Sequence, residues 1–509
     1  MAAWRTVRFA IPGTSMATDK DQSIRSSMIS GSAWMIAMRW GLRGIGLVST
    51  VILVRLLAPE DFGLVAMATL FIALLDVFTS FGVDMALIQR ADATKEHFNT
   101  AWTIRLIQAV FIALLLVVLA PFLADYFNES RVTALTMFLA IGVLVAGLEN
   151  IGIVAFRKEL EFSKEFRFAI YTKFGSFFIT IGLALWLRNY WALAWGIVGG
   201  KVVSVAMSYW MHPYRPRPSL ARFRDLWSFS QWMLLRNIGM YLRKQVDSFL
   251  VARFFDTSQM GFYSVGKEVA ELPTTDLVWP TARALFPGYA KLAHDPVRMG
   301  QAYLKVLNTI ALFAVPIGLG LALVAEPLVL VAFGERWVEI APVLAWLAFS
   351  GVFTSVSAGV QMPLIALNRM RRAAGLAWVQ LVAVLPAVMY AVTLGDLTSV
   401  AIAHAAVAAA LVPVFFATLT TLGIVSWGAV ANALWRPFVA GAVMSACVML
   451  VPEGFGGLPI IELVTKSALG AVTFTVTGFL LWRTTGQPDG GEKVIADLIG
   501  KRLAARGSG

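Results

Sequence analysis

The chain has 509 residues, of which 58% are hydrophobic and only 14% are charged, whereas an ordinary soluble domain carries roughly 25% charged residues. This composition excludes a soluble enzyme, a nucleic-acid-binding module and a disordered chain. The net charge of +12 does not by itself indicate a nucleic-acid partner, because the distribution of charge along the chain matters more than its sum.

The apolar residues are numerous enough for roughly fourteen transmembrane helices, at about 20 residues for each span. The apolar segments run for about 18 residues or more without period-two alternation, which also disfavours a transmembrane β-barrel. Turn-forming residues separate the segments. In chain order we predict helices at 30–54, 64–83, 101–123, 133–155, 168–187, 191–211, 228–252, 260–284, 305–331, 338–367, 375–394, 398–422, 430–451 and 460–482.

The loops between these helices differ in their content of basic residues. Alternate loops and both termini hold about 25 Lys and Arg residues, the opposite loops hold about five, and the richer side of a membrane protein is the cytoplasmic one. Both termini are therefore predicted to be cytoplasmic, with an even number of spans. The loops on the far side are short, so we expect no sizeable domain there.

The sequence contains an internal repeat. A shift of 198 residues aligns the first predicted helix with the seventh without gaps, and Arg55 and Gly63 coincide with Arg253 and Gly261. A second, weaker match relates the third helix to the ninth. Because six spans separate the copies, both halves would have the same orientation and be related by an axis along the membrane normal. The alternative is chance similarity between apolar helices.

These features predict an all-α membrane protein with two pseudo-symmetric six-helix bundles around a central cavity, followed by two C-terminal transmembrane helices. The expected segments are a polar cytoplasmic N-terminus (1–27), an N-terminal six-helix bundle (28–212), a basic cytoplasmic linker (213–227), a C-terminal six-helix bundle (228–424), two additional transmembrane helices (425–485) and a cytoplasmic tail (486–509).

Cysteine and histidine give no sign of a metal or catalytic site. The single cysteine, Cys447, lies in an apolar segment, and the four histidines are far apart in the sequence, whereas structural metal sites need such ligands at close spacings. We expect no disulfide, metal ion, cofactor or catalytic residue. His404 is expected to be a packed, hydrogen-bonded histidine and not a proton relay.

Charged residues inside the predicted spans carry the functional signal, because an ionised side chain at a helix centre costs about 2.5–3.5 kcal/mol on insertion scales. Arg39 and Arg43 share one face of the first helix, and Arg236 and Arg243 share one face of the seventh. The repeat makes these helices equivalent, so we expect both clusters to line a water-filled cavity that binds an anion. The candidate lining residues are Arg39, Arg43, Arg236, Arg243, Lys244, Lys173 and Lys267.

Acidic residues in the spans are fewer. Asp76 and Glu149 could pair with Arg43 or Lys173. For each charged residue the alternative is a structural ion pair or a side chain that reaches to the membrane interface. The candidates for coupling or ion-pair acids are Asp76, Glu149, Asp247 and Glu271.

A distinctive motif closes the first helix and opens the second, reading Leu-Val-Arg-Leu-Leu-Ala-Pro-Glu-Asp-Phe-Gly-Leu-Val-Ala-Met-Ala over 53–68. Further short motifs lie at 81–82, 86–90, 98–100 and 333–337. With these motifs, most of the chain from 28 to 485 resembles the polysaccharide transporter family. Its members are flippases of lipid-linked O-antigen and exopolysaccharide repeat units, in the superfamily of multidrug, oligosaccharidyl-lipid and polysaccharide exporters.

The resemblance implies two bundles that form a V in the bacterial inner membrane and open alternately to each side. The implied substrate is an undecaprenyl-diphosphate-linked oligosaccharide moved to the outer leaflet, and Arg39, Arg43, Arg236 and Arg243 would line the cationic lumen. The implied partners are this lipid, membrane lipids, a polysaccharide polymerase and a chain-length regulator, with no nucleic acid. Multidrug members often couple transport through a carboxylate on the first helix, which this chain lacks.

Two alternatives remain open. A multidrug or toxin cation antiporter would need an acidic cavity, whereas the first and seventh helices hold five cations and one aspartate. A membrane-embedded glycosyltransferase or polymerase would need an external loop with catalytic acids or histidine, and the external loops at 188–190 and 395–396 are short.

Overall fold

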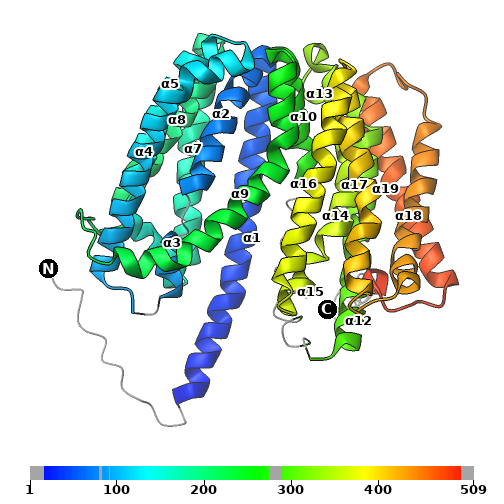
Figure 1. Ribbon diagram of the computed structural model, residues 1–509. Helices are drawn as coiled ribbons and strands as arrows, with labels where there is room; N and C mark the ends of the chain where they lie inside the picture. The colour runs from blue at the N-terminus through cyan, green and yellow to red at the C-terminus, as the bar shows by residue number, and fades with distance from the viewer. Residues whose placement is uncertain are drawn as a thin grey trace, which may run out of the picture.

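The computed structural model describes residues 16–79, 83–90, 92–273, 289, 292 and 294–493, and every regular element among them is a helix (Figure 1). The prediction of an all-helical chain is therefore confirmed. The first group of helices comprises α1 (Met16–Leu56), α2 (Pro59–Thr79), α3 (Val83–Gln89), α4 (Lys95–Phe127), α5 (Arg131–Gly147), η1 (Ile151–Ile153), α6 (Val154–Lys158), α7 (Phe162–Leu187) and α8 (Tyr190–Met211).

The second group follows a linker without regular structure at 212–220. It comprises α9 (Phe223–Phe254), α10 (Thr257–Pro273), α12 (Pro296–Leu323), α13 (Ala325–Ala332), η3 (Glu335–Trp337), α14 (Ile340–Ala358), α15 (Gln361–Ala366), α16 (Met370–Thr393), α17 (Leu397–Thr420), α18 (Trp427–Met449) and α19 (Pro459–Thr484).

Short polar side chains begin several of the long helices by accepting hydrogen bonds from first-turn backbone N–H groups, which have no partner inside the helix. The Asp396 carboxylate, for example, accepts from the N–H groups of Thr398 and Ser399. The same arrangement occurs at α8, α12 and α18, where the capping residues are Asn189, Asp295 and Ser426.

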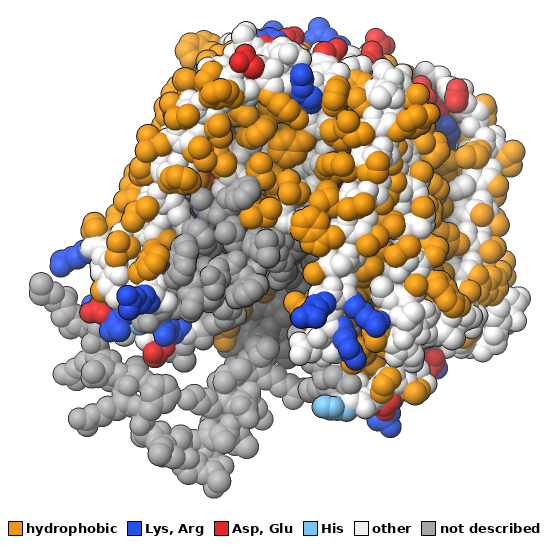
Figure 2. All heavy atoms as spheres, in the orientation of Figure 1, with side chains coloured by type: hydrophobic (Ala, Val, Ile, Leu, Met, Phe, Trp, Pro, Cys, Tyr) orange, Lys and Arg blue, Asp and Glu red, His pale blue; other side chains and the backbone are white. Residues whose placement is uncertain are grey.

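Nine helices of the described residues are long and apolar enough to cross a membrane, and a bent pair would make a tenth. The outer surfaces of these helices carry many exposed hydrophobic side chains, such as Phe122, Trp186 and Tyr390. Figure 2 shows hydrophobic side chains spread over much of the face in view. Such extensive exposed apolar surface is typical of contact with lipid and is rare on soluble proteins, so the prediction of a multi-pass membrane protein is confirmed.

Three of the predicted helices are interrupted. The helix expected over 133–155 ends at Gly147, bends by 62° and continues as η1 and α6. At the bend, the Asn150 side chain accepts from the Gly152 N–H at 2.9 Å and donates to the Tyr214 carbonyl at 2.7 Å, so polar groups outside the helix find partners. The helices expected over 305–331 and 338–367 are each divided in two, as α12 with α13 and α14 with α15.

The two groups of helices are joined at one end of the molecule, which we call the closed end. Here α1, α4, α7, α9 and α16 end, and α2, α5, α8, α10 and α17 begin. One continuous core of buried hydrophobic residues joins both groups there, and it includes Leu64, Leu135, Tyr263, Trp337 and Val400. Away from this end α1 and α9 diverge from α12 and α15 (Figure 1).

Candidate functional site

Two glycines bring the groups together at the closed end, where α2 packs along α10. A Cβ atom on Gly63 would lie 1.7 Å from the Thr257 carbonyl oxygen, and one on Gly261 would lie 1.9 Å from the Pro59 carbonyl oxygen. The contact is reciprocal, because the 198-residue shift carries Pro59 onto Thr257 and Gly63 onto Gly261. Only glycine permits backbones to approach so closely.

Two arginines that the same shift makes equivalent also cross between the groups. The Arg55 guanidinium donates from Nε to the Ala332 carbonyl at 2.9 Å and from Nη2 to the Val331 carbonyl, at a helix C-terminus where carbonyls lack partners. Arg253 lies over the Tyr126 ring at the end of α4, 5.4 Å from its centroid. Each group thus holds an arginine from the other, and the closed end is sealed on both sides.

Below this seal, three charged residues from different helices come together. Arg43 on α1 and Lys173 on α7 both act electrostatically on Glu268 of α10. Arg43 and Lys173 are half-buried, and Glu268 is exposed. We call these three residues the seam cluster. Arg39 is also half-buried, one helical turn before Arg43 on the same face of α1.

Lys173 also borders a cavity within the first group of helices. The cavity has a volume of about 230 Å³ and lies between α1, α2, α7 and α8. Besides Lys173 it is lined by the hydroxyl groups of Ser49, Ser176 and Thr180 and by apolar side chains. A volume of this size can hold several water molecules, so the ammonium group can remain hydrated.

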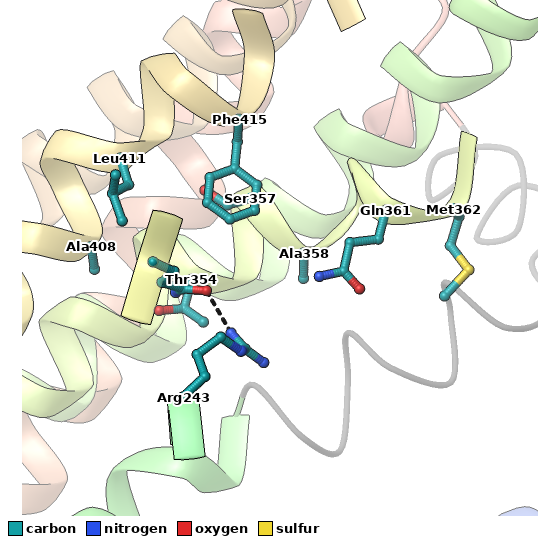
Figure 3. A pocket seen from close by; sticks show the side chains of 10 residues that line it. Arg243, Thr354, Ser357, Ala358, Gln361, Met362, Ala408, Leu411 and Phe415 are labelled. Atoms are coloured by element: carbon teal, nitrogen blue, oxygen red, sulfur yellow. Dashed lines mark hydrogen bonds between the residues drawn. The ribbon is translucent and has the colours of Figure 1, made fainter. Parts of the chain in front are cut away.

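Arg243 on α9 lies in the second group. Its Nη1 donates to the Gln380 Oε1 atom at 2.6 Å, and its Nε atom is buried without a hydrogen-bond partner among the described residues. Figure 3 shows the guanidinium directed into a cavity of about 70 Å³ beside Thr354 and Ser357. Arg243 therefore borders a cavity with a mixed polar and apolar lining between α9, α14, α15, α16 and α17. Its place in a central anion-binding cavity stays a prediction.

The remaining cationic candidates on α9 and α10 are in ion pairs. Lys244 pairs with Glu271 at 2.8 Å near the surface. Lys267 pairs with Asp247 at 2.8 Å, with their side chains 13% and 2% exposed. For these four residues the geometry is that of structural ion pairs, and Asp247 is committed to a lysine and not to the arginines. The Arg236 side chain lies outside the described residues.

The acidic candidates on the first group have partners of their own. The Glu149 Oε2 atom accepts a hydrogen bond from Ser204 at 2.8 Å, and Oε1 lies 3.9 Å from the Arg105 guanidinium. Asp76 is exposed and acts electrostatically on Lys201 and on Tyr241. The sequence could not predict these pairings, because pairing depends on how far each helix is rotated about its axis.

His404 is partly buried in the second group, where its Nδ1 atom lies 3.2 Å from the Ser350 hydroxyl. This is the packed, hydrogen-bonded environment that the sequence analysis expected. Of the described residues, no group of three or more His, Cys, Asp or Glu side chains could hold a metal ion.

The linker after α8 is fixed to the first group by hydrogen bonds. The Tyr214 hydroxyl donates to Asn99 Oδ1 at 2.6 Å, and the Ser219 N–H donates to the Thr103 hydroxyl at 2.9 Å. Burial raises the pKa of Tyr214 to about 12. Burial, followed by the charge of Lys164, lowers the pKa of His212. The linker is therefore attached to the first group of helices.

Sequence reasoning overlooked three features of the site. Glu268 lies next to Lys267 in the predicted eighth helix. It was not chosen as a site residue, although the rule that selects charges inside spans applies to it equally. Gln380 carries no charge, so the search for charged residues inside spans did not select it. The glycine contact was present in the repeat itself, since Gly63 and Gly261 are aligned by it.

Comparison with known proteins gives one family match and several relatives. A family model described as polysaccharide biosynthesis protein matches residues 52–342, more than half of the chain. The lipopolysaccharide biosynthesis protein WzxC of Escherichia coli K12 is 27% identical over 357 residues, covering 68% of this chain and 71% of that protein. The succinoglycan biosynthesis transport protein ExoT of Rhizobium meliloti 1021 is 27% identical over 475 residues, covering 89% of this chain and 92% of that protein.

Two solved structures have a similar fold. The lipid II flippase MurJ in an inward closed conformation superposes with a TM-score of 0.73 at 11% identity, over 89% of this chain and 99% of that one. An inward-facing multidrug resistance transporter of the MATE family superposes with a TM-score of 0.56 at 14% identity, over 75% and 95% of the chains. At these identities the likeness concerns the fold alone.

Proposed function

Because the chain belongs to the family of polysaccharide biosynthesis proteins, we propose that it is a flippase for oligosaccharide repeat units linked to undecaprenyl diphosphate. It moves them from the cytoplasmic to the outer leaflet of the bacterial inner membrane by alternating access. The protein is a transporter and not an enzyme. Relatives named for lipopolysaccharide biosynthesis and succinoglycan transport support this function.

The seam cluster is the observation that carries the proposal. Arg43 of α1 and Lys173 of α7 both act on the carboxylate of Glu268, and Arg39 adds another cation on the same face of α1. A diphosphate carries two or three negative charges, and each contact with a cation at 4 Å gives roughly 4 kcal/mol before desolvation at an effective dielectric constant near 20. A cationic drug would be repelled from the same place.

Guanidinium groups suit this substrate. Their planar arrangement of N–H donors matches two phosphate oxygens at once, so Arg39 and Arg43 can hold the diphosphate while the lipid tail stays between helices. Arg243 and Arg236 would add cations on α9, which the repeat relates to α1. In this proposal Lys244, Lys267, Asp247 and Glu271 hold α9 and α10 together, and Asp76 and Glu149 balance charge within the first group.

The arrangement of helices supports an inward-open state. With both termini cytoplasmic, the closed end is the outer end, and the diverging ends of α1, α9, α12 and α15 face the cytoplasm. The proposed organisation is fourteen spans in two six-helix bundles, 28–212 and 228–424, with two further spans at 425–485. The reciprocal contact of Gly63 and Gly261 supports a pseudo-twofold axis between the bundles.

A bacterial strain that lacks the gene for this protein tests the proposal. We expect its lipid-linked oligosaccharide to accumulate in the inner leaflet, and expression of the wild-type chain to restore export. A variant with Arg39, Arg43, Arg236 and Arg243 all replaced by Ala should insert into the membrane and fail to restore export. A control variant matched in charge loss should restore it; its replaced residues are the exposed Arg157, Arg217, Arg298 and Arg372. Equal export by the two variants would contradict the proposed role of the arginines.

A further inference from the structure

The ammonium group of Lys267 lies in a shell of oxygen atoms. Its Nζ atom is 2.8 and 3.0 Å from the two carboxylate oxygens of Asp247 and 2.8 Å from the backbone carbonyl of Lys244. It is also 3.1 Å from the Ser248 hydroxyl and 3.2 Å from the Gln245 side-chain oxygen. Five oxygen atoms of α9 thus surround one nitrogen atom of α10; we call them the oxygen cage.

This coordination exceeds what a lysine can use for hydrogen bonding. An ammonium group has three N–H donors, so at least two of the five oxygens interact with the positive charge alone. A shell of hard oxygen ligands at similar distances, containing one carboxylate, a backbone carbonyl, a hydroxyl and an amide, is the kind of site that binds a spherical cation.

The surroundings require a positive charge at this point. Asp247 is almost wholly buried, with 1% of its surface exposed, and an ionised carboxylate without a partner is costly in such a place. The Tyr263 hydroxyl donates to Asp247 Oδ2 at 2.7 Å and the Ser248 N–H donates to Oδ1 at 2.8 Å. Both fix the carboxylate in the orientation that faces Lys267. From outside these two helices, His404 of α17 acts on Asp247. Arg243 of α9 and Glu271 of α10 lie on the same helices as the pair, and both act on His404.

We infer that the oxygen cage on α9 is a site for a monovalent cation and that Lys267 occupies it as a tethered cation. The site needs a single charge, since one carboxylate supplies the anionic ligand. Without the lysine side chain, the same five oxygens would bind a dissolved ion of similar charge, such as Na⁺, K⁺ or NH₄⁺. This inference does not rest on the proposed function, because it concerns binding to the purified protein.

A consequence is that this site consumes no dissolved cation in the wild-type chain. The lysine supplies the charge from α10 and so joins α9 to α10. Any coupling of transport to an external ion must then occur elsewhere in the chain, or require Lys267 to leave the cage.

The inference is tested on the purified full-length protein by thermal unfolding in NaCl, KCl and NH₄Cl, against choline chloride at equal ionic strength. We expect Lys267→Ala to be stabilised saturably by the small cations and not by choline, which is too large for the cage. Equilibrium dialysis with radioactive Na⁺ should find one more bound ion for each Lys267→Ala chain than for each wild-type chain.

Two control variants separate the cage from general salt effects. Lys244→Ala retains the backbone carbonyl that belongs to the cage and removes only a surface ion pair, so it should show no cation-specific stabilisation. The double variant Asp247→Asn with Lys267→Ala has a neutral cage and should fold equally in every salt.

A Lys267→Ala protein that is folded and responds equally to all four salts would overturn the inference. Failure of Lys267→Ala to fold in every salt would also overturn it, because it would show that no dissolved ion can replace the lysine. Folding that requires a small cation, and is absent in choline chloride, would support it.

Discussion

Gly63 of α2 and Gly261 of α10 pack backbone to backbone at the closed end. The position of a Cβ on Gly63 lies 3.0 Å from the Gly261 nitrogen, and the position of a Cβ on Gly261 lies 3.2 Å from the Gly63 nitrogen. The two residues are 198 positions apart and are equivalent in the internal repeat. In the proposed transport cycle this contact must separate when the outer end opens. The stability of the contact therefore affects the balance between the inward-open and outward-open states.

Replacing either glycine by alanine should weaken the closed end. A Cβ on Gly63 would overlap the Thr257 carbonyl, and one on Gly261 the Pro59 carbonyl, so the helices must move apart at a cost of about 1–3 kcal/mol. Thermal unfolding of the purified protein should show this loss, and cysteine cross-links between α2 and α10 should form more slowly.

Two other helical glycines provide matched controls for that substitution. A Cβ on Gly182 of α7 or Gly320 of α12 would meet no atom within 4 Å, and alanine is favoured over glycine in a helix by about 0.5–1 kcal/mol. Gly182→Ala and Gly320→Ala should therefore be neutral or stabilising. Equal destabilisation at all four positions would refute the tight contact.

Arg43→Ala should weaken binding of a lipid diphosphate. A charge-assisted hydrogen bond contributes about 1.5–3 kcal/mol, which corresponds to roughly tenfold or more in the dissociation constant. Arg43→Lys should recover part of the loss, because it keeps the charge without the planar group. Titration with undecaprenyl diphosphate in detergent measures both, with Lys305→Ala, an exposed residue outside the seam cluster, as control.

The chain after α19 should contribute to stability through a buried ion pair. Arg436 Nε lies 3.0 Å from Glu492 Oε1, with side chains 6% and 8% exposed. Loss of one member of such a pair leaves a buried charge and costs about 3–5 kcal/mol. Glu492→Ala should lower the unfolding temperature markedly.

An exposed ion pair in the same segment supplies the comparison. Lys493 pairs with Asp489 at 2.7 Å, with both side chains at least half exposed, and exposed pairs contribute about 0–1 kcal/mol. Lys493→Ala should therefore have little effect on unfolding. If Glu492→Ala were as mild as Lys493→Ala, the segment would not be docked on α18.

His212 should make the protein less stable in weak acid. Burial and the charge of Lys164 lower the pKa of His212 in the folded state, so the unfolded chain takes up the proton first. This contribution to stability is present above the unfolded pKa of about 6.5 and is lost as the pH falls below it.

The test is a pair of substitutions measured by unfolding between about pH 5 and 8. The His212 Nδ1 atom accepts a hydrogen bond from the Tyr214 N–H at 3.2 Å, which the side-chain oxygen of His212→Asn can also accept. That variant should flatten the pH dependence, whereas the exposed His294→Gln should leave it unchanged. An unaltered profile in His212→Asn would assign the acid sensitivity to another group.

The sequence allowed the helical membrane fold and the polysaccharide biosynthesis family to be predicted, because apolar segments and the motif over 53–68 are local features. It also singled out Arg43 and Arg243, since charges inside spans are rare. The ion pair of Lys267 with Asp247 could not be predicted: these residues lie on different helices, and their meeting depends on helix rotation and packing. The bend at Asn150 could not be predicted either, because it depends on the carbonyl of Tyr214, which is far away in the sequence.

The most direct measurement follows a fluorescent or radiolabelled undecaprenyl-diphosphate oligosaccharide between the leaflets of proteoliposomes that contain the purified protein. Wild-type protein is predicted to make the inner-leaflet lipid accessible from outside, and the variant with Arg39, Arg43, Arg236 and Arg243 replaced by Ala is predicted to leave it inaccessible although correctly inserted. Transfer by that variant at the wild-type rate would contradict the account.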